Sequence, residues 1–320
     1  MTYLIGTDEA GYGPNLGPLV ISATVWRVPD EWRDADLYER LGHVVCRAPE
    51  RGGDARVAIA DSKQLYSSGG GVGLLERGVL AALGVADESP RQWREVWQRL
   101  APDCVEQLDA QPWFAGYDAA IPCAAAADEI EGCCERLAAG LRDAGVSLLQ
   151  LRAVAIFPQQ FNELVDRHGN KATALSHVTL SLVRDLVAPL GDEPLLIHCD
   201  KHGGRNKYGP LLQEHFPDWL VEVRHEGRAS SVYRWGPPAR RVEIRFVAKG
   251  ESFLPSALAS MISKYLRELA MRPFNDFWCC RVANLQPTAG YPVDAARFRS
   301  QIRAAQTELG ITDLVLWRNR

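Results

Sequence analysis

The alternation of apolar, strand-like runs with amphipathic helices is the feature that most constrains the fold of this chain. Runs rich in β-branched residues predict strands, among them 18–28, 151–158 and 193–200. Apolar side chains spaced three and four residues apart predict helices, among them 172–190, 257–274 ending at Pro273, and 293–310. Strands separated by helices indicate an α/β protein. We therefore expect a mixed central sheet that is flanked by helices.

The region between about residues 67 and 150 differs from the rest because it is rich in alanine and predicted to be helical. Its apolar side chains, including Trp93, Val96, Trp97 and Leu100, recur at helical spacing, so we expect them in a core. The sequence shows no internal repeat and no clear linker. We predict a single domain over 1–320, with a helical insertion at about 67–150 and helices at the C-terminal end.

Composition limits the classes of function. The net charge of −4 argues against a protein that coats nucleic acid without specificity. No apolar run is long enough to cross a bilayer, and no signal peptide precedes the first strand, so we expect a cytoplasmic protein without a membrane partner. The eight cysteines lack the spacing of a zinc site or a disulfide framework, and we expect them to be reduced. We expect a monomer.

Four carboxylates follow or end predicted strands. Asp8 and Glu9 close the first strand, Asp200 closes the run "LLIHCD", and Glu251 follows "RFVAKG". Catalytic groups of α/β proteins gather at strand ends, and converging carboxylates would repel one another unless cations lay between them. Oxygen ligands suit magnesium. The four acids together predict a site for divalent cations.

The stretch "GTDEAGYGPNLGPLV" (6–20) resembles the signature of the type 2 ribonuclease H family, which comprises ribonucleases HII and HIII. Later segments match the family in order: "DSKQL" (61–65), "LLIHCD" (195–200), "KGES" (249–252) with the helix "ALASMISKYLREL", and "AGYPVDAARF" (289–298). The resemblance covers both ends and the centre of the chain, outside 67–150. A glutamate as the fourth acid is the ribonuclease HIII pattern. The N-terminal domain of ribonuclease HIII is expected to be absent, because the motif begins close to Met1.

The resemblance implies a ribonuclease H-like fold and hydrolysis of the RNA strand of an RNA–DNA hybrid by two Mg²⁺ or Mn²⁺ ions about 4 Å apart. It implies that Asp8, Glu9, Asp200 and Glu251 are the catalytic metal ligands. The residues that it implies for substrate binding are Gly11, Tyr12, Gly13, Ser62, Lys63, Ser260, Lys264 and Tyr291. Of these, Lys63, Ser260 and Lys264 would face phosphates.

Tyr12 departs from the family pattern, in which a cation lies between the two glycines and the element reads the 2′-hydroxyl beside the scissile bond. We expect Gly11 and Gly13 to allow the backbone to approach the substrate closely. We expect Tyr12 to shift the preference toward continuous hybrids and away from a single embedded ribonucleotide.

The stretch 201–249 carries ten basic and five acidic residues, which predicts a local basic surface for phosphates. Tyr233 and Trp235 lie within it and could stack on a base or sugar. A solvated arginine surface without a ligand is the alternative for this stretch.

Two alternatives stay open for the protein as a whole. One is a nucleic-acid-binding relative of ribonuclease H that does not catalyse. The other is a zinc hydrolase that uses His198, Asp200 and His202, which would share one face of a strand.

Overall fold

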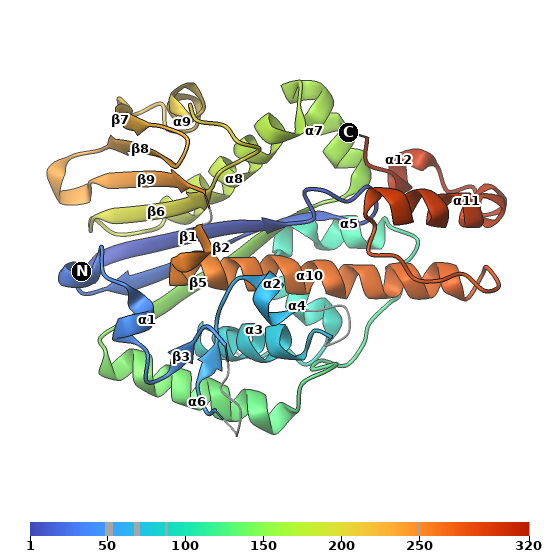
Figure 1. Ribbon diagram of the computed structural model, residues 1–320, viewed down its shortest axis with the longest axis horizontal. Coiled ribbons are helices and arrows are strands. Elements are labelled where there is room, and N and C mark those ends of the chain that lie inside the picture. The colour runs from blue at the N-terminus through green and yellow to red at the C-terminus, as the bar shows by residue number, and fades with distance from the viewer. Residues whose placement is uncertain (49–53, 67–70, 87–88, 249, 320) are drawn as a thin grey trace.

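The computed structural model describes residues 1–48, 54–66, 71–86, 89–248 and 250–319, and of Glu251 it describes the backbone alone. A central sheet crosses the molecule, with the long helix α10 on one face and α8 on the other (Figure 1). The helices of the region 71–143 lie beyond α10, and the C-terminal helices α11 and α12 extend from one end.

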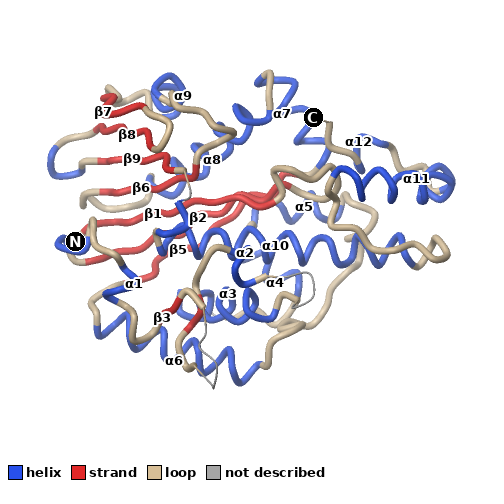
Figure 2. Tube along the Cα trace, in the orientation of Figure 1, coloured by secondary structure: helices blue, strands red, loops and turns tan. Residues whose placement is uncertain are grey.

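The main sheet has seven strands in the order β5-β2-β1-β6-β9-β8-β7 (Figure 2). The strands are β1 (Thr2–Ala10), β2 (Leu19–Val28), β5 (Ser147–Ile156), β6 (Leu195–Asp200), β7 (Glu222–Glu226), β8 (Ser230–Trp235) and β9 (Val242–Val247). β1, β6 and β9 run parallel to one another, and the other neighbouring strands pair antiparallel. The predicted mixed central sheet flanked by helices is confirmed. A small second sheet pairs β3 (Val45–Cys46) with β4 (Val57–Ala58).

The helices divide into two layers and a C-terminal group. Against one face of the sheet lie α10 (Leu254–Cys279), α3 (Gly73–Ala86), α4 (Trp93–Leu100) and α6 (Ala127–Asp143). Against the other face lie α7 (Pro158–His168), α8 (Lys171–Val187) and α9 (Gly209–His215). The remaining helices are α1 (Leu37–Arg40), α2 (Ser62–Leu65), α5 (Val105–Asp109), α11 (Pro292–Glu308) and α12 (Asp313–Leu316).

Apolar side chains along β1 and β2 point alternately into two hydrophobic cores, one on each face of the sheet. Leu4, Val20 and Trp26 belong to the core under α10, whereas Ile5 and Ile21 belong to the core under α8. Side chains of a strand point to opposite faces in turn, so both faces of these strands are covered. Trp93 and Trp97 are buried in the α10 core, as predicted.

Gly6 is the point of closest approach between the sheet and α10. A Cβ atom at Gly6 would lie 2.1 Å from the backbone nitrogen of Ser256 and 2.3 Å from the carbonyl carbon of Pro255. Thr24 on the neighbouring strand donates a hydrogen bond of 2.8 Å to the carbonyl oxygen of Pro255. The helix backbone therefore rests directly on β1, and only glycine fits beneath it.

The prediction that a helix ends at Pro273 is wrong, because α10 continues through Pro273 to Cys279. Proline lacks the N–H that would bond the carbonyl of Leu269, four residues earlier. The indole Nε1 of Trp93 donates to that carbonyl at 2.9 Å. A side chain from α4 thus replaces the missing helical bond.

Glu76 ties the helical region to α10. This fully buried carboxylate on α3 accepts hydrogen bonds of 2.7–2.8 Å from the backbone nitrogens of Cys123, Ala124 and Ala125. It also accepts one from the hydroxyl of Tyr265 on α10, at 2.8 Å. A buried carboxylate needs such donors, and here they fix the 123–125 loop against the central helix.

The single-domain organisation stays a prediction.

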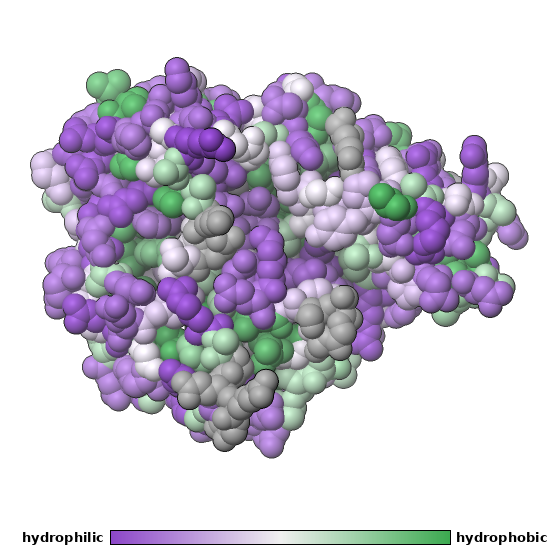
Figure 3. Space-filling view, in the orientation of Figure 1, coloured by the Kyte–Doolittle hydropathy of each residue, from purple (hydrophilic) through white to green (hydrophobic). Residues whose placement is uncertain are grey.

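The face of the molecule seen in Figure 3 is largely hydrophilic, with small hydrophobic areas between polar ones. Within the described part of the chain, no helix has the length and apolar character needed to cross a membrane.

We expect Gly6→Ala to lower the free energy of unfolding by about 1–3 kcal/mol, because the new methyl group must displace backbone atoms of α10. Urea unfolding followed by circular dichroism measures the change. Gly209→Ala is the matched control, since the nearest atoms to a Cβ there lie 3.8 Å away. Equal midpoints for Gly6→Ala and the wild type would contradict the close contact.

Candidate active site

Asp8 and Asp200 lie at corresponding places at the carboxyl ends of two neighbouring parallel strands. Gly6 of β1 pairs with His198 of β6, and the two aspartates follow two residues later on each strand. Residues two apart in a strand share a face, so both aspartates lie on the face that Gly6 presents to α10. Both are half-buried. The structure therefore brings two of the four predicted acids together.

Glu251 follows β9, the next parallel strand, in the turn Gly250–Ser252 that leads into α10. The Cβ position of Gly250 lies 3.9 Å from the carbonyl oxygen of Cys199 and 4.0 Å from the backbone nitrogen of Asp200. The backbone of the fourth predicted acid thus passes beside the end of β6. Its side chain, like the whole of Lys249, lies outside the described residues.

Glu9 follows Asp8, so alternation directs the start of its side chain toward the opposite face of β1. Glu9 lies near Tyr12. Burial raises the pKa of the Tyr12 phenol, and the negative charge of Glu9 raises it further. Burial also raises the pKa of the Cys199 thiol to about 12, with smaller contributions from Asp200 and Glu9. These influences agree with a position of Glu9 on the α8 side, because Cys199 belongs to the core under α8 and Tyr12 packs against that core.

The donor set at this strand end consists of carboxylate oxygens, which are the ligands that magnesium and manganese prefer. Asp8 and Asp200 fit such an ion in chemistry and in placement. Among the described side chains, no group of three from His, Cys, Asp and Glu is arranged to hold a metal ion.

The predicted substrate residues of the "DSKQL" segment meet α10 through a pair of serines. Ser260 Oγ lies 3.1 Å from Ser62 Oγ and 3.3 Å from the backbone nitrogen of Ser62. Asp61 caps α2 by accepting from the backbone nitrogen of Lys63, whose side chain is exposed. Ser62 and Ser260 are both buried in this contact, whereas Lys63 is exposed, so the roles of the three residues toward a substrate stay predictions.

Lys264 lies one turn beyond Ser260 on α10. Its ammonium is 2.5 Å from Glu268 and 4.0 Å from the ring centre of Tyr66. The Tyr66 hydroxyl donates to Glu268 at 3.1 Å, and burial together with this carboxylate raises the pKa of Tyr66 to about 12. Lys264 is therefore held by a carboxylate and an aromatic ring beside the serine pair.

The glycine loop after β1 is fixed by the buried guanidinium of Arg267. It donates to the carbonyl oxygens of Pro18 at 2.6 Å, Leu16 at 3.0 Å and Ala289 at 2.9 Å. Burial lowers the pKa of Arg267 to about 10, so the group stays charged at pH 7. One side chain of α10 thereby holds both the glycine loop and the segment that leads to Tyr291.

Gly11 has a positive φ of 91°, and a Cβ there would lie 2.6 Å from the carbonyl oxygen of Pro18 and 3.0 Å from Arg267. Gly13 faces Tyr291, whose ring atom Cε1 lies 3.7 Å from the Cβ position. Packing within the loop alone therefore requires glycine at position 11, and close approach of the backbone to a substrate stays a prediction. Tyr291 is 57% exposed, so its ring is accessible beside Gly13.

Tyr12 is half-buried and points toward the α8 side of the site. The Lys171 ammonium, in the first turn of α8, lies 4.5 Å from the centre of its ring. A Cβ at Gly203 would lie 3.0 Å from the Tyr12 hydroxyl, so the 201–206 segment closes over the ring. A cation is thus present beside Tyr12, although it comes from another helix.

The zinc alternative is wrong, because His202 does not join His198 and Asp200. His202 lies beyond the end of β6, with Nδ1 2.9 Å from Ser176 Oγ and its ring against Tyr208 and Phe246. Burial lowers its pKa to about 3. His198 stacks on Phe253 on the α10 side, and burial lowers its pKa to about 4.

The prediction that Tyr233 and Trp235 could stack on a nucleotide is also wrong, because both are buried in the core under α8. Their alternation along β8 was the signal for a core face.

Much of the basic stretch 201–249 is likewise engaged internally. Lys201 Nζ lies within 3.3 Å of four oxygen atoms, and Arg234 and Arg245 both bond Glu243. Lys207 and Arg228 are exposed cations of the stretch with no ion pair to the described residues.

Sequence reasoning missed four residues that shape the site: Gly6, Tyr66, Lys171 and Arg267. Gly6 stands two positions before Asp8, a spacing that could have indicated a close contact on the same face. The roles of the other three depend on contacts between distant segments, for which the local sequence carries no signal.

We expect Arg267→Met to lower the free energy of unfolding by about 3 kcal/mol, because three carbonyl groups would lose their donor in a buried place. Urea unfolding measures this, and Arg272→Met, an exposed change on the same helix, should stay within about 0.5 kcal/mol of the wild type. A loss no larger than that of Arg272→Met would show that Arg267 does not hold the loop.

Comparison with known proteins gives similarity in structure only. No family model and no curated protein matches the sequence. The chain is similar over 99% of its length to a chain of the PCNA–RNase HII complex from Archaeoglobus fulgidus, with 14% identity, a TM-score of 0.46 and 94% of that chain covered.

Two further similar structures are ribonuclease H2 from Pyrococcus horikoshii and Bst-RNase HIII in complex with Mn²⁺. The first has 16% identity, a TM-score of 0.43 and 92% of that chain covered, over 98% of this one. The second has 16% identity, a TM-score of 0.43 and 66% of that chain covered, over 99% of this one. Ribonucleases HII and HIII form the family that the motifs of this sequence resemble.

Proposed function

We propose that the protein is a divalent-metal-dependent endoribonuclease of the type 2 ribonuclease H family, which hydrolyses the RNA strand of RNA–DNA hybrids. The observation that carries the proposal is the placement of Asp8 and Asp200 on one face, at the ends of neighbouring parallel strands. Two half-buried carboxylates side by side raise each other's energy unless positive charge lies between them. Two cations and a polyanionic substrate supply the matching charges.

The residues that would hold the ions are Asp8, Glu9, Asp200 and Glu251. Ions bound there would activate the attacking water and stabilise the leaving 3′-oxygen of the cleaved strand. The contribution of the chain is rigidity: β1 and β6 are paired, and Ser263 Oγ on α10 lies 3.0 Å from the carbonyl oxygen of Asp8. A strand backbone fixed in this way places the start of the Asp8 side chain before a substrate arrives.

The substrate would lie across the start of α10. Lys63, which is exposed, would border this surface with Ser62 buried behind it, and the exposed Tyr291 would border it beside Gly13. Lys264 would bind a phosphate by giving up its ion pair with Glu268, because the phosphate and the carboxylate both offer anionic oxygens.

The monomeric state also stays a prediction.

Replacement of Asp8 or Asp200 by asparagine should lower hybrid cleavage by about a thousandfold, because several kcal/mol of charge stabilisation at the metals is lost. Binding of the hybrid should be unchanged or tighter, since each change removes a charge that repels phosphate. The measurements are cleavage of a labelled RNA–DNA hybrid in Mg²⁺ or Mn²⁺ and hybrid binding by fluorescence anisotropy.

Asp143→Asn, an exposed change on α6, is the control and should cleave like the wild type. If Asp200→Asn cleaved the hybrid at the wild-type rate, Asp200 would not be a catalytic metal ligand. Binding of the hybrid by the wild type without any cleavage would favour the alternative, a binding protein that kept the fold.

Tyr12 should set the choice between substrates. We expect the wild type to cleave a continuous hybrid faster than a single ribonucleotide within duplex DNA. Tyr12→Arg should shift the ratio of the two rates about tenfold toward the single ribonucleotide, through one charge-assisted contact. Tyr12→Phe keeps the ring beneath Lys171 and should keep the ratio. A ratio that is the same in the wild type and Tyr12→Arg would show that Tyr12 serves packing alone.

A further inference from the structure

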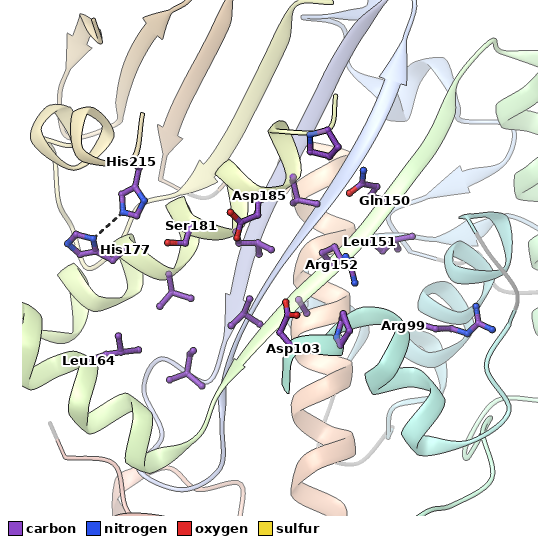
Figure 4. Close-up of a pocket in the computed structure, with 18 of the residues that line it drawn as sticks. Arg99, Asp103, Gln150, Leu151, Arg152, Leu164, His177, Ser181, Asp185 and His215 are labelled. Carbon is purple, nitrogen blue, oxygen red and sulfur yellow. Dashed lines mark hydrogen bonds between the residues drawn. The ribbon is translucent and has the colours of Figure 1, made fainter. Parts of the chain in front are cut away.

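A groove of about 850 Å³ runs along β5 (Figure 4), and neither Asp8 nor Asp200 is among its lining residues. β5 is an end strand of the main sheet, and its residues from Leu149 to Val154 all line the groove. Figure 4 shows α8, with His177, Ser181 and Asp185, on one side, and Arg99 and Asp103 on the other. The groove thus exposes a strand edge between two walls.

The outer edge of β5 is only partly occupied by the described chain. The Cys104 thiol lies 3.2 Å from the backbone nitrogen and 3.5 Å from the carbonyl oxygen of Ala155, so these groups point away from β2. Because peptide groups alternate along a strand, those of Ala153 and Leu151 point the same way. Among the described residues, no loop or side chain hydrogen-bonds to them.

We propose that this groove binds an extended, acidic segment of a partner protein, which adds a strand to the outer edge of β5. An exposed edge offers unpaired N–H and C=O groups to such a segment. The walls on both sides recess the edge, so that the β5 edge of a second copy, recessed in the same way, could not reach it. At about 3.3 Å per residue the lining run from Leu149 to Val154 spans about 20 Å, the length of about six extended residues.

The charge of the groove favours an acidic occupant. Arg152 and Arg167 are its exposed cations, against Asp103 and Asp185, and Arg99, which also lines the groove, already has a partner. Arg184 bonds Asp185 at 3.1 Å, which offsets one of the two acids. Arg152 and Arg167 are exposed and have no ion pair within the described chain. Leu83, Ala86 and Leu182 supply apolar contact for the other side chains of the added strand.

The test uses the whole protein and two ten-residue peptides, one alternating valine and glutamate, the other alternating valine and lysine. We expect the acidic peptide to bind at least tenfold more tightly by fluorescence anisotropy. It should also slow amide hydrogen exchange of Leu151 and Ala153 at least tenfold, because their N–H groups gain partners. Equal affinity for the two peptides, or unchanged exchange at both residues, would overturn the proposal.

Arg152→Glu should weaken binding of the acidic peptide at least tenfold and improve binding of the lysine peptide. Arg228→Glu is the control, since Arg228 is an exposed arginine between β7 and β8, at the opposite edge of the sheet, and should change neither affinity. If both variants weakened binding of the acidic peptide equally, the attraction would come from the charge of the whole surface, and the groove would not be the binding site. The outcome does not depend on nuclease activity.

Discussion

The direct contact between the backbone of β1 and the start of α10 is the constraint on which the rest of the structure depends. At Gly6 the two backbones approach so closely that a methyl group would overlap Ser256 and Pro255. Close-packed interiors do not absorb such an overlap without moving an element. The contact sets where α10 crosses the sheet, and that crossing decides which side chains of the helix stand beside Asp8.

Buried polar groups then fasten distant segments to this pair of elements. Arg267 on α10 bonds the glycine loop and the segment before Tyr291, while Glu76 fastens the 123–125 loop. At the C-terminal end, the backbone of Arg318 exchanges hydrogen bonds of 2.9 Å with Asn15, and its guanidinium bonds the carbonyl of Pro14. A buried donor or acceptor costs free energy unless it is paired, so these bonds specify one arrangement of the loops around the strand ends.

The electrostatic design of the proposed site follows from the same framework. Carboxylates are held at the ends of parallel strands, while cations approach from separate elements: Lys63 from α2, Lys171 from α8 and Lys264 from α10. Several of these cations already have partners, such as Glu268 for Lys264. Such partners keep the side chains in place before a polyanion arrives and reduce the entropy lost on binding. The basic stretch 201–249, by contrast, serves mainly to hold its own strands together.

The sequence by itself determined most strands of the main sheet, though not β8, together with most helix positions and the acids at strand ends, because alternation and helical spacing are local properties of the chain. The contact of Ser62 with Ser260 came from the tertiary structure, because the two residues lie 198 positions apart. Only the tertiary structure decided that α10 passes through Pro273, because the compensating donor, Trp93, lies 180 positions earlier. It likewise decided that Lys201 is satisfied internally, since a charge reveals its partner only when distant segments meet in three dimensions.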